Sequence, residues 1–235
     1  NVLECRIPSF RPDLEREIDL IEEAARIYGY NNIEDRIEST VKYDTTPPKK
    51  LIENDLRKFL SSFGFNEILT NSLLDKKDIE YFSDCPVDVL NPISQSMNTM
   101  RPSLIPGALF TISRNINIGE TDLRLFEVGN IFEKTGNKGK AEDYKERRAV
   151  SMVITGRAEF QNWNQKNRNV DFYDLKGDVE NLLGKLRLVN YKFECADQNQ
   201  FSLKIKAGRE EVGYLKQIPK EILAKFDISQ DVFVC

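Results

Sequence analysis

Leu123–Phe132 reads Leu-Arg-Leu-Phe-Glu-Val-Gly-Asn-Ile-Phe, and Arg148–Gly156 reads Arg-Ala-Val-Ser-Met-Val-Ile-Thr-Gly. Both stretches are rich in aliphatic and aromatic residues that favour β-structure. The segment between them is polar and contains Gly136 and Gly139, which favour a loop. Two such strands on either side of a polar loop predict a long antiparallel hairpin.

Helices and shorter strands are predicted on both sides of this hairpin. Apolar residues at 3-4 spacing indicate helices, and short alternating runs indicate strands. Because the helices are segregated from a mostly antiparallel sheet, the fold class is α+β. The predicted helices are Asp13–Tyr30, Leu51–Phe63, Lys76–Phe82, Ser103–Ile116, Asp171–Leu186 and Pro219–Phe226; the predicted further strands are Asn66–Leu74, Val87–Leu90, Tyr191–Glu194, Phe201–Lys206, Glu211–Gln217 and a last one ending at Cys235.

A polar segment, Glu34–Lys50, ends in Thr45-Thr46-Pro47-Pro48 and predicts an extended linker. The roughly 40 residues before it are too few for an independent domain. We therefore expect residues 1–37 to be the end of a preceding small domain, 38–50 a linker, and 51–235 a core truncated at its carboxy-terminus.

The composition excludes several classes of protein and site. The chain has 235 residues, of which 40% are hydrophobic and 31% charged, as in ordinary soluble proteins. It contains no apolar run near the ~20 residues of a membrane span and no signal peptide, so a cytoplasmic location without a membrane partner is expected. Its four cysteines form no Cys-x-x-Cys pair, which argues against structural zinc and a disulfide framework.

The absence of histidine excludes Ser-His-Asp, Cys-His and His-metal chemistry. A net charge of −4 argues against a dedicated nucleic-acid-binding domain, and no DNA partner is expected. The segment Lys134–Arg148 is locally basic; we favour a solvated hairpin loop over a phosphate-contacting one. Trp163 is expected to be a packing anchor.

Four carboxylates gather near the amino-terminus: Asp13, Asp19, Glu22 and Glu23. On a helix the last three share a face, where like charges repel unless something neutralises them. A Mg²⁺ ion would do so, and so would Arg26, one turn further on. From spacing alone, the pairing with Arg26 is preferred.

Several stretches resemble, in the same order, the β subunits of bacterial phenylalanine-tRNA ligases. The resemblance implies a class II synthetase-like antiparallel sheet flanked by helices, preceded by the end of a small helical, winged-helix-like domain. The stretches are Ile7–Asp13, Asp19–Tyr30, Asn91–Ser94, Met100–Leu104, Leu125–Gly129 and Asp171–Gly177.

The same resemblance implies partners and cofactors. The partners are a catalytic α subunit in an (αβ)₂ heterotetramer and tRNA(Phe), and ATP is used by the whole enzyme only. Asp13, Asp19, Glu22 and Glu23 match the family's magnesium positions, in a site shared with the α subunit. The fragment is then expected to serve subunit assembly and tRNA positioning.

The residues for catalysis are not found. Class II tRNA synthetases present an Arg and a Glu two residues apart on such a strand, whereas Arg124 and Glu127 are three apart and should project from opposite faces. No Gly-x-Gly and no P-loop is present, and Lys216 stands where the family commonly has a glycine. We expect no catalytic or cofactor-binding residues here; the alternatives are a free-standing class II ligase and a general RNA-binding module.

Overall fold

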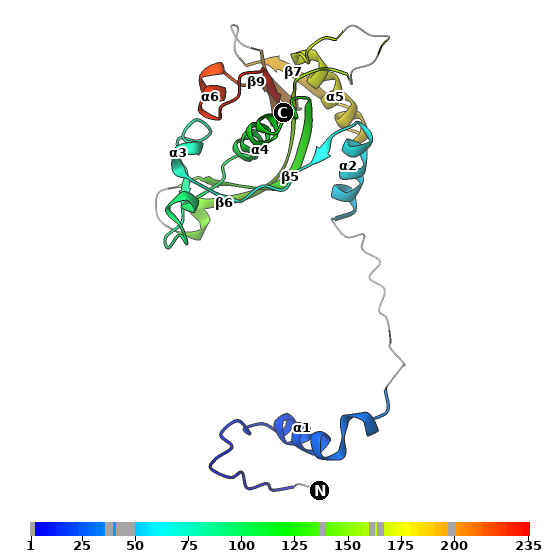
Figure 1. Cartoon of the computed structure of the whole chain (residues 1–235), viewed down its shortest axis with the longest axis vertical. Coiled ribbons are helices and arrows are strands. Elements are labelled where there is room, and N and C mark those ends of the chain that lie inside the picture. Colours follow the sequence, from blue (N-terminus) through cyan, green and yellow to red (C-terminus); the bar gives the residue numbers. More distant parts are fainter. Residues whose placement is uncertain are drawn as a thin grey trace. The chain divides into compact units, whose positions relative to one another are not determined.

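The structure, a computed structural model, describes residues 3–35, 40, 50–136, 140–159, 163, 167–196 and 201–235. The chain divides into two compact units, Asn1–Pro47 and Pro48–Cys235, which are described separately (Figure 1). Most of the predicted linker, residues 38–50, lies outside the described residues. The domain boundaries given above therefore stay predictions.

The smaller unit contains helix α1 (Glu17–Tyr28) and the 3-10 turn η1 (Tyr30–Asn32). Gly29 ends α1 with a φ of 90°, a conformation that glycine adopts at no steric cost. None of the residues of α1 is buried. A helix is confirmed here, but it starts four residues later than the predicted Asp13.

The larger unit is built on a seven-stranded sheet with the order β1-β5-β6-β10-β9-β8-β7. Neighbouring strands are antiparallel except for the parallel pair β1 and β5. Its strands are β1 (Asn66–Glu67), β5 (Leu123–Lys134), β6 (Tyr144–Thr155), β7 (Tyr191–Cys195), β8 (Ser202–Ala207), β9 (Glu210–Gln217) and β10 (Val232–Val234).

The predicted hairpin is confirmed as β5 and β6, whose register runs from Leu123 opposite Thr155 to Lys134 opposite Tyr144. A second, three-stranded sheet has the order β2-β4-β3. It consists of β2 (Leu73–Leu74), β4 (Thr99–Met100) and β3 (Val87–Asp88), and helix α3 (Lys76–Ile79) and the turn η2 (Gln95–Met97) connect these strands.

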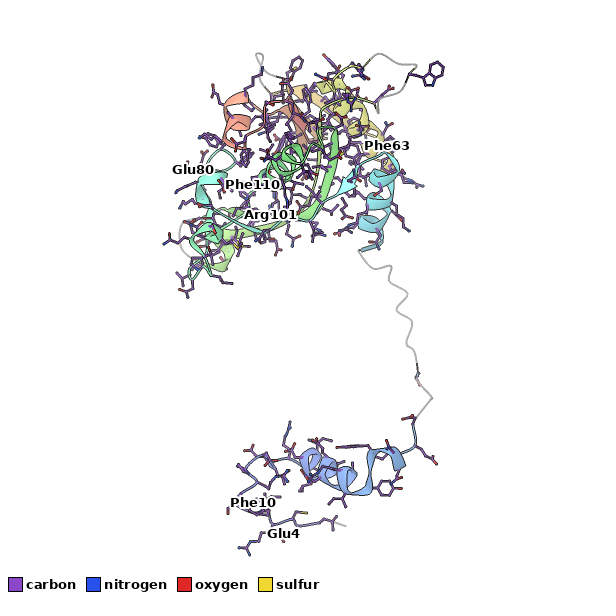
Figure 2. All side chains as sticks on the ribbon, viewed as in Figure 1. Glu4, Phe10, Phe63, Glu80, Arg101 and Phe110 are labelled. Carbon is purple, nitrogen blue, oxygen red and sulfur yellow. The ribbon has the colours of Figure 1, made fainter. Side chains whose placement is uncertain are left out.

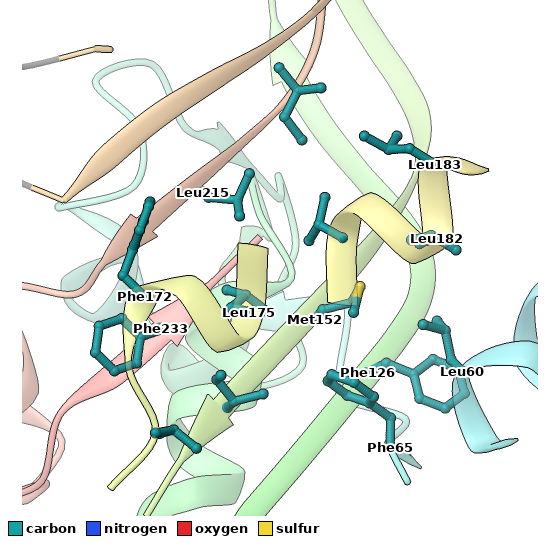
Figure 3. Packing of buried hydrophobic residues seen from close by; sticks show 14 of the residues in the cluster. Leu60, Phe65, Phe126, Met152, Phe172, Leu175, Leu182, Leu183, Leu215 and Phe233 are labelled. Atoms are coloured by element: carbon teal, nitrogen blue, oxygen red, sulfur yellow. The ribbon is translucent and has the colours of Figure 1, made fainter. Parts of the chain in front are cut away.

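Two hydrophobic cores cover the two faces of the large sheet. On one face Phe126 and Met152 pack under helices α2 (Lys50–Ser62) and α5 (Phe172–Lys185). Figure 3 shows α5, carrying Leu175, over the strands. On the other face Leu125 and Val153 pack under α4 (Ile105–Asn117) and α6 (Lys220–Lys225). The alternation of side chains along each strand produces this division, and the α+β class is confirmed.

Three predictions were wrong in detail. The predicted strand Asn66–Leu74 is two short strands that belong to different sheets, and β4 was not predicted. Trp163 is 97% exposed rather than a packing anchor.

Among the helices that the structure describes, none is long and apolar enough to cross a membrane.

Candidate functional site

The acidic cluster of the smaller unit is bound by arginines. Nη2 of Arg11 donates to Oδ2 of Asp13 at 2.7 Å and to Oε1 of Glu23 at 2.5 Å. Arg26 donates to the other oxygen of Glu23, as its position on the helix suggested. The hydrogen bonds from Arg11 are the main cause that holds the pKa of Asp13 and the pKa of Glu23 below their ordinary values.

The other two carboxylates differ in their surroundings. Oδ2 of Asp19 accepts the backbone N–H of Arg16 at 2.8 Å and that of Glu15 at 3.1 Å, and Oδ1 accepts Nη2 of Arg16. These bonds, that from the Arg16 backbone first, lower the pKa of Asp19. Asp19 therefore satisfies free N–H groups at the start of α1. Glu22 is exposed and has no hydrogen bond or ion pair to a described residue.

The donor chemistry of this cluster fits Mg²⁺, which prefers carboxylate oxygens. Its present geometry does not form a coordination sphere, since three of the four carboxylates are held by arginines or backbone amides. In the described part of the chain, no group of three or more His, Cys, Asp or Glu residues is arranged to hold a metal. For a cation to bind Asp13 and Glu23 together, Arg11 would have to move.

Arg124, on β5, lies on the α5 face of the sheet. Its Nη2 donates to Oδ2 of Asp178 on α5, and its Cζ lies 4.6 Å from the centroid of the Phe65 ring. Burial raises the pKa of Asp178, and the nearby Arg124 opposes this shift. The guanidinium thus joins β5 to α5 by an ion pair, and it joins β5 to the connection between α2 and β1 by a cation–π contact with Phe65.

Glu127 lies on the α4 face and is only 1% exposed. Oε1 accepts Nη1 of Arg101 at 2.7 Å and the backbone N–H of Thr70 at 3.2 Å; Oε2 accepts the Thr70 hydroxyl at 2.7 Å. Nε of Arg101 donates to the carbonyl of Asn130 at 2.8 Å. Arg101, labelled in Figure 2, is also buried. Hydrogen bonds on both partners offset the cost of burying the two charges.

Two glycines make room for this network. A Cβ on Gly107 would lie 2.3 Å from the hydroxyl of Thr70, and one on Gly129 would overlap the guanidinium of Arg101. Contacts this short do not occur between unbonded atoms. The network therefore depends on glycine at both positions.

The prediction that Arg124 and Glu127 project from opposite faces is confirmed. Each side chain binds partners within the chain, and the two do not face a common cleft. Sequence reasoning missed Thr70 and quoted Arg101 only as part of a motif. The available signal was Gly129, which follows Glu127 on the same face of the strand and leaves space for a long side chain.

Both ends of the basic segment Lys134–Arg148 are strand rather than loop. β5 extends to Lys134 and β6 begins at Tyr144, so the predicted loop boundaries were wrong at both ends. Arg148 forms two hydrogen bonds with Glu53 on α2, at 2.9 and 2.7 Å, and Arg147 pairs with Glu133. Lys138 lies outside the described residues. The segment's two arginines are thus engaged by carboxylates of the same chain.

Lys216 lies half-buried on the α4 face. Its ammonium is 5.1 Å from the centroid of the Tyr214 ring and 6.0 Å from that of Phe82. Burial lowers the pKa of Lys216. Lys216 thus packs against the aromatic rings of Tyr214 and Phe82 as an amphipathic side chain.

Sequence comparison finds two matching families. Residues 35–235 match the family described as the phenylalanyl tRNA synthetase beta chain CLM domain, and residues 1–30 match the tRNA synthetase B5 domain.

Curated relatives cover almost the whole chain. A phenylalanine-tRNA ligase beta subunit of Chlorobaculum tepidum is 41% identical over 97% of this chain and 30% of the relative. The Chlorobium chlorochromatii subunit has the same identity and coverage. That of Salinibacter ruber is 32% identical over 100% of this chain and 31% of the relative. The chain thus spans about 30% of the length of these relatives.

Solved structures share the fold at low identity. The Desulfitobacterium hafniense pyrrolysyl tRNA synthetase PylSc superposes with a TM-score of 0.60 at 15% identity, over 80% of this chain and 65% of that one. A second structure of the pyrrolysyl-tRNA synthetase from this organism gives the same TM-score at 14% identity. The larger unit therefore has the class II synthetase-like architecture.

Proposed function

The chain belongs to the family of phenylalanine-tRNA ligase β subunits, and from this premise we propose that it is the subunit's non-catalytic, synthetase-like core. The whole enzyme joins phenylalanine to tRNA(Phe) at the expense of ATP. In this proposal the chain serves subunit assembly and tRNA positioning in the cytoplasm. The chemistry belongs to a catalytic α subunit, within an (αβ)₂ heterotetramer.

One observation supports the non-catalytic role above others. Two charged residues of β5, Arg124 and Glu127, are bound to Asp178 and Arg101, respectively, on opposite sides of the sheet. A ligase active site needs charged groups that converge on one nucleotide in an open cleft. These two groups already stabilise the packing of the sheet against its own connections.

Exposed apolar side chains support the assembly role. Leu90 and Ile93, in the connection between β3 and β4, are 94% and 98% exposed, and Leu69 is 87% exposed. Val89 donates to the carbonyl of Asn98 at the base of this connection. Apolar groups held out on an ordered loop are suited to contact with a protein partner.

The magnesium site remains part of the proposal. Asp13, Asp19, Glu22 and Glu23 would supply carboxylate oxygens, and the α subunit would complete the coordination. Mg²⁺ would neutralise the cluster's negative charge at the junction between the subunits. Glu22, which has no partner among the described residues, is the carboxylate most ready to bind it.

The test compares this chain with the assembled enzyme. We expect the purified chain to form no phenylalanyl-adenylate above a no-protein control. The complete β subunit, co-expressed and copurified with its α subunit, should charge tRNA(Phe). Adenylate formation by the chain alone would contradict the proposal and favour the free-standing ligase.

A general RNA-binding module is less well supported, since Arg147 and Arg148 are already paired with carboxylates. Tight binding of unrelated RNAs by this chain, falling steeply with salt, would favour that alternative.

A further inference from the structure

β7 (Tyr191–Cys195) is the last strand at one side of the large sheet and pairs with β8. Such an edge strand exposes backbone N–H and C=O groups that can pair with another chain. Among the described residues, no segment forms backbone hydrogen bonds with the outer side of β7. The edge is therefore open over the five residues of the strand.

The direction of the backbone groups along β7 follows from two hydrogen bonds at its ends. The N–H of Ala196 donates to the carbonyl of Ser202 at 3.0 Å, and the N–H of Gly208 donates to the carbonyl of Asn190 at 3.4 Å. Each bond continues the register of β7 and β8 by one residue. In an antiparallel pair, residues that bond the neighbouring strand alternate with residues that do not.

This alternation divides the residues of β7 into two sets. Lys192 and Glu194 direct their backbone groups to β8. Tyr191, Phe193 and Cys195 direct their N–H and C=O groups away from the sheet, and none of these groups has a backbone partner among the described residues. A second strand satisfies them if its own outward groups have the same two-residue spacing, and another copy of β7 meets this condition.

The charges of β7 favour one register for two such copies. Lys192 and Glu194 are exposed and lie on the face opposite to that of Phe193. If a two-fold axis passes through Phe193, Lys192 of each copy lies opposite Glu194 of the other. If the axis passes through Lys192 or Glu194, that residue lies opposite its own copy, and like charges in this position are destabilising. Either of these registers also places one outward residue beyond the end of the other β7.

Lys192 has no counter-charge in the described part of the chain. The residue opposite it on β8 is Lys206, and Lys192 forms no ion pair with a described residue. Nζ of Lys206 lies 2.5 Å from Oε2 of Glu194. In the register centred on Phe193, Glu194 contacts Lys206 of its own copy and lies opposite Lys192 of the other. The second copy thus supplies the carboxylate that Lys192 lacks.

The other face of β7 carries aromatic side chains. The rings of Tyr191 and Phe193 are 5.5 Å apart, and Nζ of Lys176 on α5 lies 4.7 Å from the centroid of the Phe193 ring. In the same register the two Phe193 side chains lie opposite each other, and Tyr191 lies opposite Cys195, which is exposed. Aromatic residues in opposite positions stabilise a strand pair.

We propose that β7 is a homotypic pairing edge, at which two copies of this chain join their large sheets across a two-fold axis at Phe193. The contacts are reciprocal, as in any two-fold interface, so an ion pair between Lys192 and Glu194 forms on each side of the axis. The edge is only five residues long, and the small interface makes the association weak. The proposal rests on strand geometry and charge, and it is independent of the proposed function.

Sedimentation equilibrium of this chain, between about 1 μM and about 1 mM, tests the pairing. We expect the wild type to show a monomer–dimer equilibrium. Lys192→Glu places carboxylates opposite each other, and Glu194→Lys places ammonium groups opposite each other, so each variant should dimerise about fivefold or more weakly. The double variant Lys192→Glu/Glu194→Lys restores opposite charges and should dimerise as the wild type does. An equimolar mixture of the two single variants should associate more tightly than either variant alone.

Matched controls change the same charges away from the edge. Lys220→Glu and Glu221→Lys lie at exposed positions of α6 and should leave dimerisation unchanged. A wild type that stays monomeric over the whole concentration range would overturn the proposal. Single edge variants that dimerise as tightly as the wild type would also overturn it, and so would a double variant that dimerises as weakly as the single ones.

Amide hydrogen exchange measured by NMR gives a second readout. The N–H groups of Phe193 and Cys195 should exchange at least about tenfold more slowly at the highest protein concentration than at the lowest. The N–H of Glu194, which bonds β8, should exchange slowly at both concentrations. Unchanged exchange of Phe193 in a sample that sediments as a dimer would place the interface elsewhere and overturn the proposal.

Discussion

A Cβ on Gly129 would lie 2.2 Å from Nη2 of Arg101, so the strand residue and the guanidinium occupy adjoining space that only glycine allows. Gly129 follows Glu127 by two positions on β5, and both face Arg101. The carboxylate binds the guanidinium while the glycine admits it. A single strand thus supplies both the charge and the space for a buried ion pair.

Gly129→Ala should destabilise the larger unit by about 1–3 kcal/mol, the usual cost of overpacking, because Arg101 has to move. The free energy of unfolding in urea measures this. Gly177→Ala is the matched control, since a Cβ at Gly177 on α5 meets nothing within 4 Å and alanine favours helix. Equal stability of Gly129→Ala and the wild type would contradict the packing described here.

Arg101→Met and Glu127→Gln should each lower the free energy of unfolding by about 3–5 kcal/mol, because each leaves the buried charge of the other residue without its counter-ion. The double variant should cost less than the sum of the two. Urea unfolding of all four proteins gives the coupling energy. Additive costs would show that the two side chains do not interact.

Asp174 provides a test of pH dependence. Arg168 holds it through two hydrogen bonds of 2.6 Å, which are the main cause of its lowered pKa. The pKa of such a carboxyl is lower in the folded chain than its value of about 3.9 in the unfolded chain. The carboxylate therefore contributes its full stabilisation at pH values above about 3.9. This contribution to the free energy of unfolding is lost as the pH falls through the pKa of the folded chain. Asp174→Asn keeps an acceptor for the start of α5 and should lose less stability between pH 7 and pH 3.

The ion pair between Arg168 and Asp174 is partly exposed. Asp174→Asn should therefore lower the free energy of unfolding by about 1 kcal/mol or less at pH 7. Glu120→Gln, at an exposed position, is the control and should follow the wild type at every pH. If the wild type and Asp174→Asn lose the same stability between pH 7 and pH 3, the ion pair between Arg168 and Asp174 does not contribute to the pH dependence.

The magnesium proposal predicts a cation-dependent subunit contact. Glu22→Gln in the complete β subunit should weaken its association with the α subunit several-fold when Mg²⁺ is present. Removing Mg²⁺ with a chelator should weaken the wild-type complex to the same extent and leave the variant unchanged. Association can be measured by sedimentation. Glu17→Gln, in the first turn of α1, is the control; a chelator effect that persists in Glu22→Gln would exclude this residue as a ligand.

Sequence periodicity was sufficient for the fold class and for the hairpin. The side chains of Leu123–Val128 alternate between the two cores. The same alternation in the sequence predicted a strand and placed Arg124 and Glu127 on its opposite faces. Asp171 also caps α5 as predicted. These features depend on residues close together in the sequence.

Features that depend on distant residues were missed. Thr70 reaches Glu127 across 57 residues, and no local pattern indicates that contact. β1 and β2 were joined into one strand because the alternation continues through Ile68 and Leu69, whereas the chain changes sheets there. Arg11 binds the acidic helix from outside it, so helical spacing pointed only to Arg26.

The long register of β5 and β6 also has a consequence for the order of folding. Its strands are joined by the short connection 135–143, so little chain entropy is lost when they meet. Hairpins of this kind form within about 1–10 μs. β1 can join only when Asn66 reaches Leu125 across a much longer loop. We expect the hairpin to be the nucleus of folding, and the parallel edge strand to be added late.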